Sequence, residues 1–159
     1  MIVVADTTPL NYLVLIGHVD ILPQVFAQVL VPEAVMAELR HPAAPTAVRD
    51  WATNPAPAWL EVKKPGTLEP ALEFLGAGER EAIALALETS ADALLIDERA
   101  GRREAAKRRL SVIGTLAVLD EAGRRGLIDF DAALVRLRQT TFRLSSALLR
   151  ALGRPRTTS

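Results

Sequence analysis

The chain has 159 residues, of which 50% are hydrophobic, and this is enough for one domain with a buried core. It contains no cysteine and 2 histidines, which excludes disulfides and thiolate metal sites and disfavours a zinc site. Any bound metal is therefore expected to be a hard cation held by carboxylates. No run approaches ~18 uninterrupted apolar residues, and the N-terminus lacks the basic flank and cleavage site of a signal peptide, so we expect a cytoplasmic protein with no membrane segment.

The formal net charge is zero, but the two signs are separated along the chain. Residues 1–98 hold 5 Lys or Arg against 14 Asp or Glu, a net charge of −9, whereas residues 99–159 hold 14 against 5, a net charge of +9. Charge runs usually form solvated helix faces. The separation also fits an acidic metal pocket beside an arginine-rich surface for a polyanion, and the sequence leaves both interpretations open.

The first strand is predicted over residues 2–5, and it ends directly on Asp6. Thr7 and Thr8 follow, and the next helix is predicted over residues 9–16. Each of these three polar side chains could cap that helix, because Asp and Thr are both favoured at helix N-caps. Asp6 could equally be a functional acid at the end of an apolar strand.

The second strand is predicted at residues 29–31, and a helix at 32–39 follows, opening on a proline suited to a first helical turn. Glu38 lies on that helix among apolar residues. An isolated helical glutamate is usually a surface residue that pairs with a nearby base, but this one could also belong to a partly buried face. A short helix at 45–53 and a third strand at 59–62 come next.

The stretch GAGEREAIALALE predicts a helix over residues 78–89 with an almost wholly apolar pattern. Glu79 and Glu81 both lie in its first turn, where carboxylates interact favourably with the helix dipole and with unpaired backbone N–H groups. Either acid could therefore serve only to stabilise the helix. Either could also be a metal ligand if other acids lie nearby.

The fourth predicted strand, residues 93–96, ends on Asp97 in the stretch LLID. This aspartate could cap the helix that follows or act in a functional site. That helix is predicted over residues 99–109 and is rich in arginine. Arg102 and Arg103 are its best candidates for binding a phosphate backbone, although a solvated helix face explains them equally well.

The rest of the chain continues the alternation of strands and helices. A fifth strand is predicted at 111–113, with helices at 115–125, 131–139 and 145–152. Alternation of this kind indicates a three-layer α/β/α sandwich with a central parallel sheet. We expect one domain over residues 1–153 and a flexible tail at 154–159.

The acids singled out above are expected to meet at one edge of this sheet. The crevice of an open parallel sheet lies at the carboxyl ends of its strands, where Asp6 and Asp97 are placed. If Glu38 and either Glu79 or Glu81 lie nearby, the carboxylates repel one another unless a cation is bound between them. Mg²⁺ and Mn²⁺ prefer such oxygen ligands and can deliver water to a phosphodiester.

Several stretches together resemble the PIN-domain ribonucleases, the family that includes the VapC-like toxins of bacterial toxin–antitoxin pairs. The stretches are DTTPLNYL, VPEAVMAEL, GAGEREAIALA, LLIDERAGRREA and VIGTLAVL, in this order and spacing. The likeness covers residues 2–145 and is closest to an uncharacterised PIN-like branch. It implies a PIN-like sandwich fold and an acidic metal site.

The resemblance implies a role for individual residues. The first PIN aspartate falls on Asp6, and the small hydroxyl residue that accompanies it is either Thr7 or Thr8. The helical acid of the second motif falls on Glu38.

The third and fourth acids are less direct matches to the family pattern. The third falls on Glu81 or Glu79, and we favour Glu81 because the helix and strand between it and Asp97 have about the family's length. The fourth falls on Asp97, although many relatives have Ser or Thr there and their Asp two residues later, where this chain has Arg99. Glu98 is a weaker alternative for this position.

On this resemblance the chain would be a metal-dependent endoribonuclease. The four acids would hold Mg²⁺ or Mn²⁺, and water would cleave RNA to leave a 5′-phosphate and a 3′-hydroxyl. Thr7, Thr8, Arg102 and Arg103 would contact the RNA, giving affinity without sequence choice. A small antitoxin protein is expected to cover the acidic groove, and a homodimer is expected because PIN proteins commonly dimerise.

Two alternatives stay open. A catalytically inactive PIN-like module could bind RNA or protein, and the imperfect match at the fourth acid favours it. A phosphatase of the haloacid-dehalogenase kind also begins with an apolar strand that ends on a catalytic aspartate. It needs a second aspartate at the position where this chain has Thr8.

Overall fold

Five parallel strands form a central sheet in the computed structural model, which describes residues 1–53 and 56–153. The strands are β1 (Ile2–Ala5), β2 (Gln28–Pro32), β3 (Leu60–Lys63), β4 (Ala93–Leu95) and β5 (Val112–Ile113). Their order in the sheet is β3-β2-β1-β4-β5. Every predicted strand is present, with small differences at its ends, whereas the tail expected at 154–159 lies outside the described residues.

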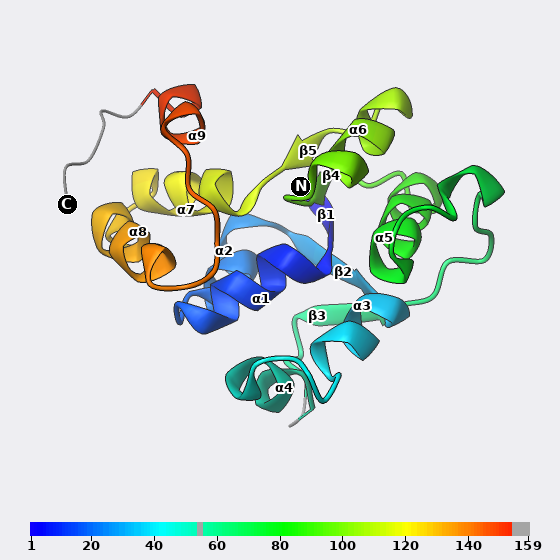
Figure 1. Ribbon diagram of the computed structural model, residues 1–159, viewed down its shortest axis with the longest axis horizontal. Coiled ribbons are helices and arrows are strands. Elements are labelled where there is room, and N and C mark those ends of the chain that lie inside the picture. The colour runs from blue at the N-terminus through cyan, green and yellow to red at the C-terminus, as the bar shows by residue number, and fades with distance from the viewer. Residues whose placement is uncertain (54–55, 154–159) are drawn as a thin grey trace.

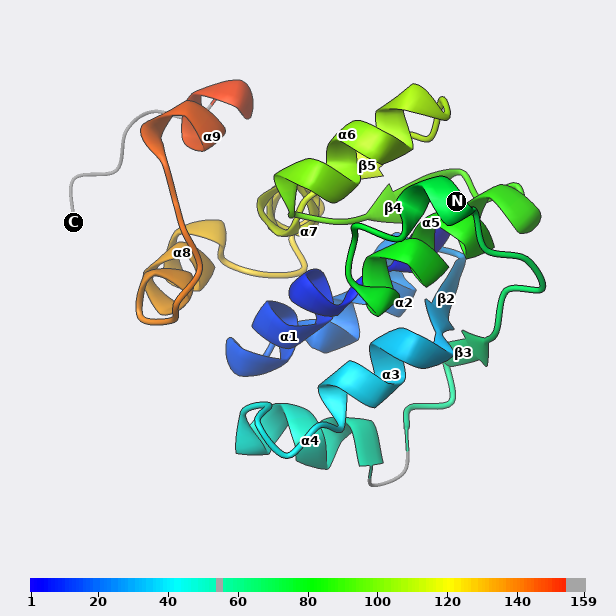
Figure 2. The same ribbon diagram turned by 45° about the vertical axis from the view of Figure 1, so that its right-hand side comes forward.

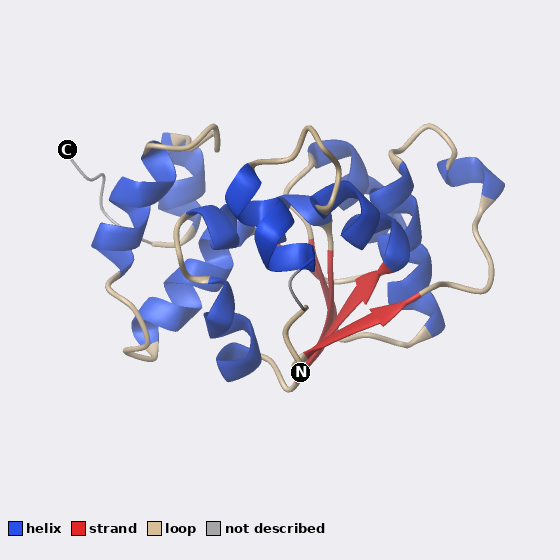
Figure 3. Ribbon diagram, turned by 90° about the horizontal axis from the view of Figure 1, so that it is seen from below, coloured by secondary structure: helices blue, strands red, loops and turns tan. Residues whose placement is uncertain are grey.

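Helices cover both faces of the sheet, which confirms the predicted α/β/α sandwich (Figures 1 and 3). They are α1 (Thr7–Leu15), α2 (Leu22–Val25), α3 (Glu33–Leu39), α4 (Thr46–Thr53), α5 (Ala77–Glu88), α6 (Arg99–Lys107), α7 (Thr115–Arg124), α8 (Phe130–Arg138) and α9 (Ser146–Ala151). The 3₁₀ helices η1 (Val19–Ile21) and η2 (Pro70–Leu72), like α2, were not predicted, because a single turn is too short to show a helical period. None of the described helices combines the length and apolar character that crossing a membrane requires.

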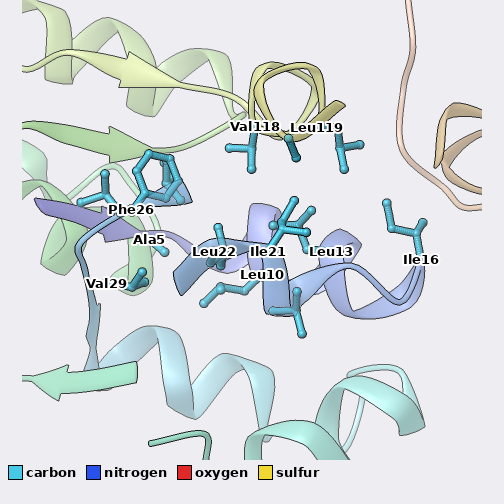
Figure 4. Close-up of a cluster of buried hydrophobic side chains, with 14 of the residues drawn as sticks. Ala5, Leu10, Leu13, Ile16, Ile21, Leu22, Phe26, Val29, Val118 and Leu119 are labelled. Carbon is cyan, nitrogen blue, oxygen red and sulfur yellow. The ribbon is translucent and has the colours of Figure 1, made fainter. Parts of the chain in front are cut away.

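Side chains of the strands alternate between the two faces of the sheet and enter two apolar clusters. Val3 and Ala5 of β1 belong to the larger cluster, together with residues of α1, α3, α7 and α8. Figure 4 shows part of it, where side chains from β1, α1 and α7 gather. Val4 of β1 belongs to the smaller cluster, with residues of α5 and α6. Val3, Val4 and Ala5 of β1 are therefore buried, on both faces of the sheet.

The order of the strands reverses between β1 and β4. From β1 the chain proceeds outward to β2 and β3, and it then returns past the start to place β4 on the other side of β1. Ala5 pairs with Leu95, so the carboxyl ends of β1 and β4 lie side by side. Ligands of open parallel sheets bind at such reversal points. Asp6 and Asp97 follow these two strands.

We expect Leu10→Ala, on the buried face of α1, to lower the free energy of unfolding by about 2–5 kcal/mol. Leu10 is 0% exposed and belongs to the larger cluster, so truncation leaves a cavity between the helix and the sheet. Urea unfolding followed by circular dichroism measures the change. Val135→Ala, at a position 54% exposed on α8, is the control and should stay within about 0.5 kcal/mol of the wild type. Equal losses in the two variants would contradict the packing described here.

Candidate active site at the carboxyl edge of the sheet

Asp6 is the central acid of this site. It follows β1 directly, is 2% exposed, and donates its backbone N–H to the carbonyl of Leu95 at 2.9 Å. It occupies the N-cap position of α1, but its side chain makes no capping hydrogen bond. Within the described residues its buried Oδ1 has no hydrogen-bond partner. Capping of the helix therefore does not account for this carboxylate.

Burial is the largest effect on Asp6 and raises the pKa of its carboxyl from 3.8 to about 7. The backbone N–H of Thr7 opposes the rise, while the negative charges of Glu79, Glu38 and Asp97 add to it. These acids come from α5, from α3 and from the end of β4. The fold thus gathers four carboxylates from separate parts of the chain, whereas their function as ligands stays a prediction.

Glu38 joins three helices at this edge. Its carboxylate accepts hydrogen bonds from the Thr7 hydroxyl of α1 and from the Gly78 backbone N–H of α5, the latter at 3.0 Å. A Cβ at Gly78 would lie 2.8 Å from both carboxylate oxygens of Glu38, closer than such contacts allow. Only glycine therefore lets the start of α5 approach the Glu38 carboxylate this closely.

Glu79 lies one residue further along α5 and is partly buried. Burial raises the pKa of its carboxyl, and the nearby charges of Glu98 and Glu38 raise it further. In the described part of the chain its buried Oε2 has no hydrogen-bond partner. This oxygen points toward α6, because a Cβ built at Gly101 would lie 2.6 Å from it.

Asp97 is held by Thr115 at the start of α7. One carboxylate oxygen accepts the Thr115 backbone N–H at 2.9 Å, and the other accepts the Thr115 hydroxyl at 2.6 Å. Burial raises the pKa of Asp97, although these hydrogen bonds and the charge of Arg102 oppose the rise. Asp97 therefore satisfies the first turn of α7, and not the helix that directly follows it in sequence.

Glu81, favoured above as the third acid, contacts the start of α3. Its Oε1 accepts the backbone N–H of Ala34 at 3.1 Å, so it stabilises the first turn of α3. Of these two acids, Glu79 is the one whose charge acts on Asp6. The lengths of the helix and the strand cannot tell which of the two neighbouring acids faces the strand end, so the identity of the third acid stays a prediction.

The residues predicted to contact RNA are spread over α1 and α6. The Thr7 hydroxyl donates a hydrogen bond to the Glu38 carboxylate, whereas Thr8 lines a cavity next to Asp97. Arg102 lines the same cavity and donates to the carbonyl of Ile96 at 2.9 Å. Arg103 is exposed on α6, as a contact with a large ligand would require.

Sequence reasoning missed Thr115, Gly78 and Gly101. Thr115 follows β5 in the stretch VIGT, so its place after a strand was a usable signal. The two glycines have no such signal, because a close approach between an acid and a backbone depends on how separate helices pack.

The acids offer the oxygen ligands that Mg²⁺ and Mn²⁺ prefer. Asp6 and Glu79 each have a buried oxygen without a hydrogen-bond partner in the described part of the chain, which fits a cation ligand. Glu38 and Asp97 already accept hydrogen bonds. Over residues 1–53 and 56–153, no group of three or more His, Cys, Asp or Glu side chains is arranged to hold a metal ion. The donor chemistry therefore fits a divalent cation, provided that the hydrogen-bonded carboxylates turn.

Because the pKa of Asp6 is about 7 in the folded chain and 3.8 when unperturbed, Asp6 destabilises the fold increasingly as pH rises from about 4 to 7. Without metal, we expect Asp6→Asn to be more stable than the wild type at pH 8, by at most about 4 kcal/mol, and to lose this advantage near pH 4. Thermal unfolding in EDTA across this range measures the effect. The exposed Asp50→Asn is the control and should follow the wild-type curve, and a parallel curve for Asp6→Asn would contradict the electrostatic description.

Comparison with known protein families identifies the family of the chain. A family model described as a PIN domain matches residues 2–154. No curated protein and no solved structure matches the chain. The match spans both the parallel sheet and every acid of the site. The chain therefore belongs to the PIN-domain family.

Proposed function

We propose that the chain is a metal-dependent endoribonuclease. PIN domains are generally nucleases, and family membership argues against the haloacid-dehalogenase alternative. The observation that carries the proposal is the buried Asp6 carboxylate, which has an unpartnered oxygen and lies among the charges of Glu79, Glu38 and Asp97. Such an arrangement is costly in a folded chain unless a proton or a cation neutralises it.

In this proposal Asp6 and Glu79, each with a buried oxygen that has no hydrogen-bond partner among the described residues, would hold Mg²⁺ or Mn²⁺, with Glu38 and Asp97 as the other acids of the site. A bound cation would supply Lewis-acid chemistry there, activating water and offsetting the negative charge that develops in phosphodiester hydrolysis. The chain's own groups position the acids: Thr7 and the start of α5 orient Glu38.

The neighbouring cations of the chain attract the substrate. Arg102 lies close enough to Asp97 to lower the pKa of that carboxyl, which supports a contact between its guanidinium and the phosphate backbone. Arg103 adds an exposed positive charge on the same helix. Phosphate contacts of this kind fix the position of RNA without selecting a base.

A toxin role, a small antitoxin that covers the acidic groove and a homodimer belong to the same proposal, and all three follow from the family resemblance. The toxin role is tested by growth arrest on expression of the wild type compared with Asp6→Asn.

The second candidate is a PIN-like module that binds RNA or protein without cutting it. The observation that favours it is the hydrogen bonding of Glu38 and Asp97, which engages carboxylate oxygens that a cation would need. The two candidates differ in one property: the ribonuclease cleaves RNA when metal is bound, whereas the binding module does not cleave RNA.

We expect Mn²⁺ to raise the melting temperature of the wild type and to support cleavage of single-stranded RNA with 5′-phosphate ends. A cation present at a hundredfold excess over its Kd adds about 2.7 kcal/mol of stability. Asp6→Asn should lose both effects while remaining folded, and EDTA should abolish cleavage. Asp50→Asn is the matched control, because it removes an exposed carboxylate on α4 that is not one of the acids around Asp6. A wild type that binds Mn²⁺ but leaves RNA intact would instead favour the non-catalytic module.

The variant Gly78→Ala tests whether the position of the Glu38 carboxylate matters for activity, without a large change in the stability of the fold. The added Cβ would meet the Glu38 carboxylate, which is the end of an exposed, flexible side chain and can turn away. We expect the melting temperature to change little, since alanine also favours a helix by up to ~1 kcal/mol. RNA cleavage should fall by about 10- to 100-fold, as for other groups that position metal ligands. Full activity in a correctly folded Gly78→Ala variant would show that the position of the Glu38 carboxylate is not needed for cleavage.

A further inference from the structure

A cavity of about 810 Å³ opens beside the candidate site. Asp97 and Glu98 lie in its wall, so it is continuous with the acidic site. The remaining wall comes from α1, from the starts of α6 and α7, and from the C-terminal part of the chain. In Figure 2 the orange segment after α8 leads to α9, and residues of α6, α7 and α9 all line the cavity. The volume lies within the usual range for pockets that bind small organic groups.

One part of the wall carries positive charge. Arg99 and Arg102 reach the cavity from α6, and Arg143 reaches it from the segment before α9. Arg99 and Arg143 form no ion pair with any carboxylate among the described residues. By contrast, Arg108 further along α6 is held by Glu69 and Glu104. Unpaired guanidinium groups match the geometry of phosphate oxygens and bind them with two hydrogen bonds.

Another part of the wall is apolar and aromatic. Phe142 lies there with aliphatic side chains of α7 and α9. Its ring packs edge to face on Tyr12, with centroids 5.0 Å apart and an interplanar angle of 82°. The Tyr12 hydroxyl is hydrogen-bonded to the Thr141 hydroxyl at 2.8 Å, which fastens this segment to α1. The aromatic wall is therefore preformed, and an aromatic ring is a suitable surface for stacking a base.

We propose that this cavity binds one nucleotide of the RNA strand, next to the phosphodiester at the acidic site. Its base lies against Phe142 and its phosphate is bound by Arg99 and Arg143. This proposal rests on the ribonuclease function proposed above, and it adds a subsite that α1, α6 and the C-terminal segment build together. Charge complementarity favours RNA as the occupant, because two unpaired arginines adjoin both an aromatic wall and the acidic site.

The test measures RNA binding apart from cleavage. A fluorescein-labelled single-stranded RNA of ten nucleotides is titrated by anisotropy against full-length protein carrying Asp6→Asn, with Phe142→Leu or Arg143→Ala added. Phe142→Leu should raise Kd by about 5- to 100-fold, the range expected for loss of one stacked base, and Phe142→Tyr should restore binding. Arg143→Ala should weaken binding and reduce the slope of log Kd against log salt by about 0.7, as for one lost phosphate contact with a single strand. Arg150→Ala, an exposed arginine on α9 outside the cavity wall, is the matched control and should change neither quantity.

The same substitutions on the background with Asp6 intact separate the two proposals. KM for RNA should rise with kcat nearly unchanged, because neither side chain belongs to the acidic site. Unchanged Kd and KM in correctly folded Phe142→Leu and Arg143→Ala would overturn the subsite, as expected if the cavity receives a polypeptide, and would leave the ribonuclease proposal standing. RNA binding that depends on Phe142 and Arg143 without any Mn²⁺-dependent cleavage would support the subsite and overturn the proposed function.

Discussion

The constraint on which the site depends is the burial of a carboxylate at the end of the central strand. β1 is covered on both faces, and Asp6, which follows it directly, is itself buried. Burial disfavours the charged form of an acid, and further acids nearby disfavour it more. The chain nevertheless brings Glu79, Glu38 and Asp97 into electrostatic range of Asp6. The fold therefore stores an unfavourable interaction that proton or cation binding relieves.

The contacts that hold these acids also hold the helices. Glu38 links α1, α3 and α5 through Thr7 and the Gly78 N–H. Asp97 ties the end of β4 to the first turn of α7, and Glu81 ties α5 to the first turn of α3. Carboxylates suit these positions because the first turn of a helix presents unpaired N–H groups. The acidic edge is thus part of the framework, so a cation that drew Glu38 or Asp97 inward would exchange helix contacts for metal contacts.

Much of this arrangement could be predicted from sequence because it follows from local pattern. Short apolar runs that end on Asp6 and Asp97 identify both the strands and the edge at which the acids meet. The choice between Glu79 and Glu81 could not be predicted, since both lie in one helical turn and only the packing of α5 against α3 and α6 decides their directions. The cavity could not be predicted either, because Tyr12 and Phe142 meet from opposite ends of the chain.

The fold brings the acidic and basic parts of the sequence together at one edge of the sheet. The acidic first part of the chain supplies Asp6 and the three acids around it, and α6, the first basic helix, begins two residues after Asp97. Several cations of the basic part are neutralised by neighbours, among them Arg108, Arg124 and Arg125. The arginines beside the cavity are not neutralised in this way among the described residues. A polyanion that approached the acidic edge would therefore be repelled by the carboxylates and attracted by these arginines. A cation bound to the carboxylates would remove the repulsion. If the chain binds both metal and RNA as proposed, each would for this reason strengthen the binding of the other.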